Sequence, residues 1–353
     1  MVLNIVQIFQ IEKLTNSDNS HKMICMKEQT LIDLYKTCGL SSSEIETAVQ
    51  AYRYYAGFLE QRDITIEQAS LEDVQTHITN LQQQNDNSRE VLMALARAHY
   101  LAGNNQIYIY FTQILERENI IKNLRTHIKA VVGEEKSSSL FGSIDVPLSG
   151  SPPDTAVPFT RSLVIELQDR LPKEMVVKAL CGNAHGIPAS AFAKEREYFL
   201  KSSSLAAYLE DFHKRSVDIL DEHYRSGKVW FEQEISGDTV EYVRKHREIL
   251  GGVLTDGIIY WTKIPFKPAD WLKQEDPQKK RYLACHCPMV REALAVPDGC
   301  FPRVWCNCTA GYIKQRFNAI FDAETHVELL DSVLGGDDRC RFAIHVPERI
   351  LKG

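Results

Sequence analysis

The spacing of apolar residues changes near residue 228, and this change constrains the fold more than any other feature of the sequence. Before it, apolar residues recur three and four positions apart, which is the period of an amphipathic helix. After it, Val229, Phe231 and Ile235 alternate with other residues, which is the period of a half-buried strand. The sequence therefore predicts an α+β fold, with an N-terminal helical bundle followed by an antiparallel sheet packed with helices.

Capping signals divide the N-terminal part into separate helices. Ser41 with Glu44, and Ser70 with Asp73, have the spacing of a capping box, and Ser88 opens a further helix. A stretch rich in Ser, Gly and Pro follows, and its composition is typical of a linker. We therefore expect three parts, which are a helical domain (27–130), a linker (131–158) and a Cys-rich α+β ligand-binding domain (159–353).

Within the last part, short apolar segments predict strands between further helices. We expect strands at 228–235, 257–264 and 281–287, and at 303–308 either a strand or an extended lead into a helix. The turn Gly335-Gly336-Asp337-Asp338 separates two more apolar segments, 326–334 and 339–346, and predicts a β-hairpin.

Composition argues against a charged macromolecular partner. The net charge is −6, which gives no overall attraction to nucleic acid or to an anionic membrane. No apolar run approaches the ~20 residues that a membrane-spanning helix needs. The first residues lack a basic leader and a small-residue cleavage site, which predicts a cytoplasmic protein with no membrane association.

Four segments of the helical part resemble a known DNA-binding clamp. They are 52–59, 70–78, 88–92 and 96–100, and together they are similar to the SAM-like core-binding domain of tyrosine recombinases. The resemblance implies DNA association. However, acidic residues outnumber basic ones over 27–130, and the chain contains no His-x-x-Arg, so the recombinase catalytic signature is missing. We therefore favour protein contacts or dimerisation, with DNA association as the alternative.

Two Cys-x-Cys pairs mark the C-terminal region, Cys285 with Cys287 and Cys306 with Cys308. Residues two apart in a strand point to the same face, so each pair would present two sulfurs together. Four thiolates suffice for a tetrahedral zinc ion or an iron–sulfur cluster. These four cysteines are therefore the predicted metal ligands, with no cofactor as the alternative.

Other readings of the cysteines remain open from the residues alone. Cysteine is among the most buried residue types, so packed or redox-active thiols without metal are one alternative. A nucleophilic cysteine is another, and it would need a base such as His286, His185 or His326. Cys300, between the two pairs, and Cys340, after the predicted hairpin turn, extend the cluster.

The segment from Cys306 to Ile344 carries a second resemblance. A Glu-bearing strand, Gly336-Asp337, and then Cys340-Arg341-Phe342 on the return strand resemble the closing hairpin of the 4-vinyl-reductase domain family. They are also similar to the end of the L-2-amino-thiazoline-4-carboxylic acid hydrolase-like family. The resemblance implies an antiparallel sheet packed with helices around a pocket, with metal-binding Cys or His residues in some members. Cys340 matches that pattern, whereas Ser332 stands where the vinyl-reductase family tends to have a cysteine.

A further candidate site lies in Cys181-Gly182-Asn183-Ala184-His185-Gly186. Cys181 and His185 would share a face if this segment were helical, and the glycines would let the backbone approach a ligand closely. The alternative is a helix end with an incidental histidine. Arg339 and Arg341 would share one face of the return strand, where they meet either solvent or an acidic ligand.

These features predict a sensor-like protein that binds a small molecule, a metal ion or both at its Cys-rich C-terminal region. One alternative is an enzyme, a hydrolase or reductase, that acts on a small heterocyclic substrate. The other is a DNA-associated protein. The sequence leaves the formation of a homo-oligomer open.

Overall fold

The computed structural model describes residues 28–296 and 301–352, and it divides the chain into two compact units. The first unit comprises Met1–Glu118 and Val146–Thr155, and the second comprises Asn119–Asp145 and Ala156–Gly353. These bounds differ from the predicted domain ranges, because residues of the expected linker are distributed over both units. The N-terminal residues interpreted as cytoplasmic, and Cys300, lie outside the described residues.

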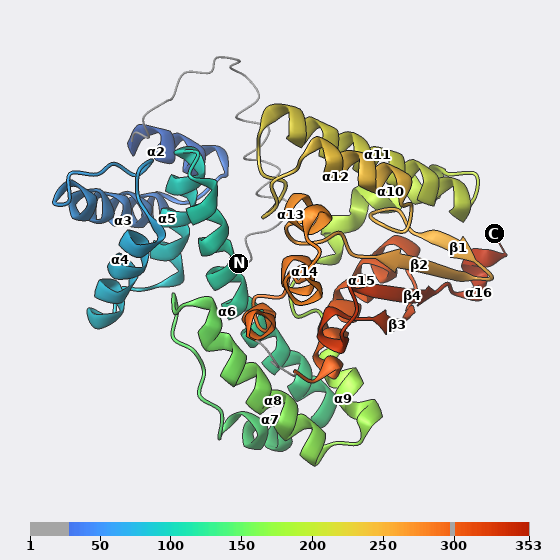
Figure 1. Cartoon of the computed structure of the whole chain (residues 1–353). Helices are drawn as coiled ribbons and strands as arrows, with labels where there is room; N and C mark the ends of the chain where they lie inside the picture. The colour runs from blue at the N-terminus through green and yellow to red at the C-terminus, as the bar shows by residue number, and fades with distance from the viewer. Residues whose placement is uncertain (1–27, 297–300, 353) are drawn as a thin grey trace. The chain divides into compact units, whose positions relative to one another are not determined.

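The first unit is a helical bundle around an apolar core (Figure 1). Its capping signals act as predicted, since the Ser41 hydroxyl accepts from the Glu44 amide while the Glu44 carboxylate accepts from the Ser41 amide. Its helices are α2 (Glu28–Thr37), α3 (Ser42–Glu60), α4 (Leu71–Gln83), α5 (Arg89–Leu101) and the first part of α6 (Asn105–Val132).

The second unit begins with helices and contains the sheet. The rest of α6 packs with the helices that follow it around a large apolar core. These helices are α7 (Glu134–Phe141), α8 (Ala156–Arg170), α9 (Lys173–Leu180), α10 (Ala193–Lys201), α11 (Leu205–Ser226) and α12 (Gly237–Lys245). Three short 3₁₀ turns lie between helices of the chain. The turn η1 (Pro153–Thr155) belongs to the first unit, and η2 (Ala189–Phe192) and η3 (Arg291–Ala295) belong to the second.

A four-stranded antiparallel sheet, ordered β1-β2-β4-β3, confirms the α+β prediction. The strands are β1 (Val253–Thr255), β2 (Ile258–Thr262), β3 (His326–Asp331) and β4 (Arg341–His345). The predicted C-terminal hairpin is β3 and β4, joined through the turn η5 (Val333–Gly335), and β3 carries a register shift between Leu329 and Asp331. Strand β4 therefore lies between β2 and β3.

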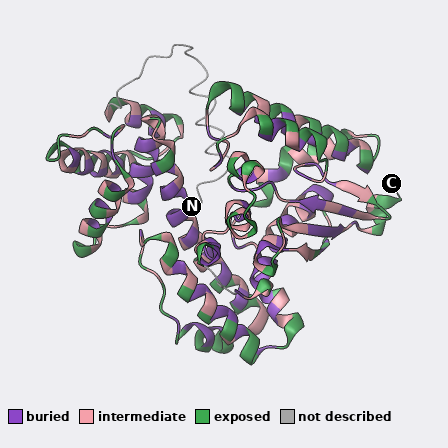
Figure 2. Cartoon of the chain, viewed as in Figure 1, coloured by how far each residue is buried: buried purple, intermediate pink, exposed green. Residues whose placement is uncertain are grey.

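The two faces of the sheet have different environments. One face is buried, and Trp261 on it packs against Phe212 of α11 and Phe317 of α15 (Asn307–Phe321). Figure 2 shows buried residues along the central strands β2 and β4. The other face, which we call the open face, carries more polar and more accessible residues, namely His326, Glu328, Tyr260, Arg341 and His345, together with the buried Ala343.

Two predicted strands are wrong, and the segment 303–308, predicted as a strand or an extended lead into a helix, leads into a helix without being extended. Within 228–235 only Trp230 and Gln233 pair, because Phe231 has a positive φ of 55° and the segment folds back on itself. Residues 281–287 fall largely in α14 (Pro277–Ala284), since Asp276 caps the helix and Pro277 occupies its first turn. Residues 303–308 form the 3₁₀ turn η4 (Arg303–Cys306) and the start of α15.

Two short helices complete the second unit, α13 (Pro268–Lys273) and α16 (Glu348–Leu351). Strand β1 was not predicted, although Asp256 and Gly257, both with positive φ, form the tight turn that joins it to β2. Among the described residues, no helix has both the length and the apolar composition that crossing a bilayer requires.

Candidate functional site

Four cysteines from three separate segments gather in the second unit, and we call them the thiol cluster: Cys285, Cys287, Cys306 and Cys340. Cys285 caps the C-terminus of α14, Cys306 ends η4, and Cys340 directly precedes β4. The Cys285 thiol interacts electrostatically with those of Cys287 and Cys340. The thiol cluster therefore contains three of the four predicted metal ligands, Cys285, Cys287 and Cys306, and Cys340 is its fourth member.

Hydrogen bonds fix the orientation of three of these sulfurs. The Ser332 hydroxyl donates to Cys306 Sγ at 3.0 Å, and the Trp305 indole N–H donates to Cys287 Sγ at 3.3 Å. Cys306 and Cys340 share a hydrogen bond between their side chains. Ser332 therefore lies at the cluster and contacts one of its sulfurs.

Burial and mutual contact divide the cluster into two kinds of thiol. Burial raises the pKa of Cys285 and that of Cys287, so both thiols stay protonated at neutral pH. The hydrogen bond with Cys340, and then burial, raises the pKa of Cys306. The same hydrogen bond lowers the pKa of Cys340 to about 7, because the Cys306 thiol donates to the Cys340 thiolate.

Cys308 lies in the first turn of α15. It is 3% exposed and belongs to the large apolar core of the second unit. The prediction placed Cys306 and Cys308 on one face of a strand, but the chain is helical from Asn307 onward, so residues two apart point in different directions. The Cys-x-Cys pair at 306–308 therefore lacks the strand geometry on which the prediction rested.

The predicted histidines have other roles. His286 Nε2 lies 2.6 Å from the Ile264 carbonyl, and burial lowers the pKa of His286, so the neutral ring donates this hydrogen bond. Cys181 ends α9, and the residues after it are not helical, so Cys181 and His185 do not share a helix face. The His185 ring instead packs edge-on against Tyr312 of α15, 5.4 Å between centroids.

Gly182 serves packing within the protein. A Cβ built on Gly182 would lie 2.3 Å from the His127 ring, and one built on Gly311 of α15 would lie 2.3 Å from the Gly182 carbonyl oxygen. The close backbone approach predicted for this segment is therefore made to α15 and α6.

The cluster does not form a preorganised tetrahedral metal site in this structure. Four thiolates around zinc lie about 3.8 Å from one another, given Zn–S bonds of about 2.3 Å. Among the described residues, no three of these sulfurs lie within 4.8 Å of one another. Zinc binding here would require the loops that carry Cys285 and Cys287 to adjust.

A polar cleft of about 680 Å³ opens beside the sheet of the second unit. Its volume lies within the range of small-molecule sites. Both guanidinium and carboxylate groups line it, together with His246 and Thr262, and the charged residues are Arg247, Glu248, Asp331, Asp337, Asp338, Arg339 and Arg341. Such a lining suits a small polar ligand better than an apolar one.

Two arginines of the cleft are held in place by hydrogen bonds. Arg341 donates two bonds to the Glu248 carboxylate, at 2.8 and 2.7 Å, and Thr262 donates a third at 2.8 Å. The Arg341 guanidinium lowers the pKa of Glu248, which therefore stays ionised. Arg339 donates to the Tyr242 hydroxyl at 2.8 Å. The sequence predicted that these arginines meet either solvent or an acidic ligand. Their place in the lining of the cleft favours a ligand site.

Sequence reasoning missed the other wall of the cleft, from His246 to Ile249. These residues follow α12, and their only local signal was a run of charged residues after a helix. The long-range bond from Arg341 to Glu248 brings this wall to β4, and no local pattern predicts a contact between segments so far apart in the chain.

Comparison with known proteins gives one match. A family model described as "Family of unknown function (DUF6144)" matches residues 265–351, about a quarter of the chain, and this segment contains the whole thiol cluster. No curated protein and no solved structure matches the sequence. The chain is thus similar to that family over the part of the second unit that holds β3 and β4.

Proposed function

We propose that the second unit is a sensor-like binding module in which a ligand site and a thiol site share one segment of chain. The cleft would hold a small polar molecule, and the thiol cluster would hold a thiophilic metal ion, with zinc as the first candidate. The observation that carries the proposal is the position of Cys340. Arg339 and Arg341 line the cleft, while the Cys340 thiol between them joins the buried cluster.

The segment from Ser332 to Arg341 supports coupling between the two sites. The Ser332 hydroxyl contacts Cys306, whereas its backbone N–H donates to the carboxylate of Asp337, a residue of the cleft, at 2.8 Å. A change in the position of the sulfurs would therefore shift the backbone that carries the charged groups of the cleft. Ligand and metal would then alter each other's affinity reciprocally.

The resemblance to the vinyl-reductase family also supports the proposal, since it implies a pocket within an antiparallel sheet packed with helices. Reaction with a small heterocyclic substrate, DNA association through the first unit and a cytoplasmic location stay predictions of the sequence.

Zinc titration of the reduced full-length chain, in competition with a chromophoric chelator, tests the thiol site. Alkylation followed by peptide mapping then shows which thiols the metal protects. We expect protection of Cys285, Cys287, Cys306 and Cys340, and weaker zinc binding by Cys306→Ser and Cys340→Ser. Cys38→Ser, in the first unit, is the matched control and should bind zinc as the unsubstituted chain does. Free alkylation of the four thiols in excess zinc would exclude the thiol site.

A thermal-shift screen with small dicarboxylates and amino acids tests the cleft. A ligand of the cleft should raise the melting temperature of the unsubstituted chain but not that of Arg339→Gln. Arg244→Gln is the matched control, because Arg244 is exposed, pairs with Glu241 and does not line the cleft. Equal shifts of the melting temperature in Arg339→Gln and Arg244→Gln would show that the ligand binds outside the cleft.

A further inference from the structure

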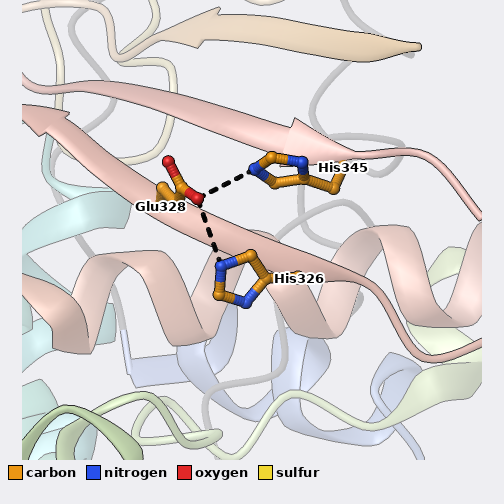
Figure 3. A group of neighbouring side chains, drawn as sticks. All are labelled: His326, Glu328 and His345. Atoms are coloured by element: carbon orange, nitrogen blue, oxygen red, sulfur yellow. Dashed lines mark ion pairs between the residues drawn. The ribbon is translucent and has the colours of Figure 1, made fainter. Parts of the chain in front are cut away.

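The open face of the sheet carries a second group of potential metal ligands, away from sulfur. His326, Glu328 and His345 lie together on β3 and β4 (Figure 3), and their three ligand atoms all fall within 4.8 Å of one another. Glu328 Oε1 is 3.1 Å from His345 Nε2 and 3.4 Å from His326 Nε2. Among the described residues, no other three His, Cys, Asp or Glu side chains have ligand atoms within this distance of one another.

Strand register explains why these three side chains meet. His326 and Glu328 are two apart on β3, so both point to the same face. His326 pairs directly with His345 across the β3–β4 ladder, and Glu328 pairs with Ala343. The Glu328 carboxylate lies between the two imidazoles and pairs with both (Figure 3).

Two of the three distances between the ligand atoms match those around a small divalent metal ion. In a tetrahedral site with bonds of about 2.0–2.1 Å, neighbouring ligand atoms lie about 3.3 Å apart. The two distances from Glu328 Oε1, 3.1 and 3.4 Å, bracket this value. The third pair, His326 and His345, lies within 4.8 Å, so the three ligand atoms are close enough to surround one ion.

We propose that His326, Glu328 and His345 form a binding site for a divalent transition-metal ion such as Zn²⁺. Two imidazoles and one carboxylate are a donor set found in open zinc sites and in non-haem iron sites. The side chains are 71%, 49% and 39% exposed, in the order His326, Glu328 and His345. Solvent or an oxygen atom of a ligand completes the coordination, so the site is open rather than structural.

Cobalt tests the site, because its absorption spectrum distinguishes the ligands. Full-length protein without a polyhistidine tag is first treated with a chelator and then titrated with Co²⁺. At the proposed site, visible d–d bands appear without the near-ultraviolet charge-transfer band that thiolate ligands give. A charge-transfer band would report the thiol cluster instead, so the outcomes for the two sites are separable.

Single substitutions decide between a site and a surface ion pair. His345→Asn and Glu328→Gln should each weaken Co²⁺ and Zn²⁺ binding by roughly tenfold or more. Glu324→Gln is the matched control, since Glu324 is an exposed carboxylate near β3 that pairs with Lys314. The proposal is overturned if the unsubstituted chain shows no d–d bands, or if His345→Asn and Glu328→Gln bind as tightly as Glu324→Gln. Circular dichroism confirms that each variant is folded.

Discussion

Ser332 donates a hydrogen bond to the sulfur of Cys306 while its own side-chain oxygen accepts one from the Leu334 amide at 3.2 Å. Ser332 is fully buried, so its hydroxyl has no solvent to replace these partners. Ser332 therefore joins the thiol cluster to the turn before β4.

Ser332→Ala should destabilise the second unit by about 1–3 kcal/mol, because it leaves the Leu334 amide and the Cys306 thiol without their partner. The free energy of unfolding in urea measures the effect. Ser203→Ala, at an exposed position, should change it by less than about 0.5 kcal/mol. Equal effects of the two substitutions would contradict a structural role for the Ser332 hydroxyl.

The thiol pair of Cys306 and Cys340 should release its first proton near neutral pH, since the shared hydrogen bond lowers the pKa of Cys340 to about 7. Thiolate absorbance near 240 nm, followed from about pH 5 to 9, measures this step. Cys306→Ala and Cys340→Ala should both abolish it, because the pair titrates as a unit. Cys38→Ala should retain it, because burial raises the pKa of Cys38. Loss of the step in Cys38→Ala would assign it to another thiol.

The ion pair of Glu248 and Arg341 should make stability depend on acidic pH. Arg341 lowers the pKa of Glu248 in the folded state, so the unfolded chain takes up the proton first as the pH falls. The ion pair therefore contributes fully to the free energy of unfolding at pH values above the ordinary pKa of glutamate. This contribution is lost as the pH falls through the lowered pKa of Glu248. Urea midpoints of the unsubstituted chain and Glu248→Gln should converge between about pH 6 and 3. A constant difference would contradict the pairing.

Gly311→Ala should destabilise the second unit by about 1–3 kcal/mol or more, since the new Cβ would overlap the Gly182 backbone, which cannot move away as a side-chain end can. Gly57→Ala in α3 is the matched control, because a Cβ there meets nothing within 4 Å. The control should be neutral or stabilising by up to about 1 kcal/mol, as alanine favours a helix more than glycine does. Differential scanning calorimetry measures both.

Local signals allowed much of the fold to be predicted. The Ser41 and Glu44 capping box and the turn around Gly336 each act within a few residues, so the helix start and the hairpin followed from the sequence. The error at 281–287 arose from two competing local signals. Asp276 and Pro277 start a helix, and that helix continues through apolar residues that also have strand character.

The candidate sites could be predicted only in part, because they join distant segments. The Cys-x-Cys spacing pointed to Cys285 and Cys306, which lie in the thiol cluster, but it did not predict the helix that begins at Asn307. The contact between Arg341 and Glu248 depends on the tertiary fold alone. His326 and Glu328 carried a usable signal, since His-x-Glu in a strand places both side chains on one face, but the partner His345 required the β3–β4 register.

The order of the strands has a consequence for biosynthesis. Strand β4 lies between β2 and β3 and is the last of the four to be translated. Until residues 341–345 leave the ribosome, β2 and β3 lack their shared neighbour, and both expose backbone groups that can pair with another chain. A nascent chain stalled before β4 is thus the form most prone to aggregation, and most in need of a chaperone.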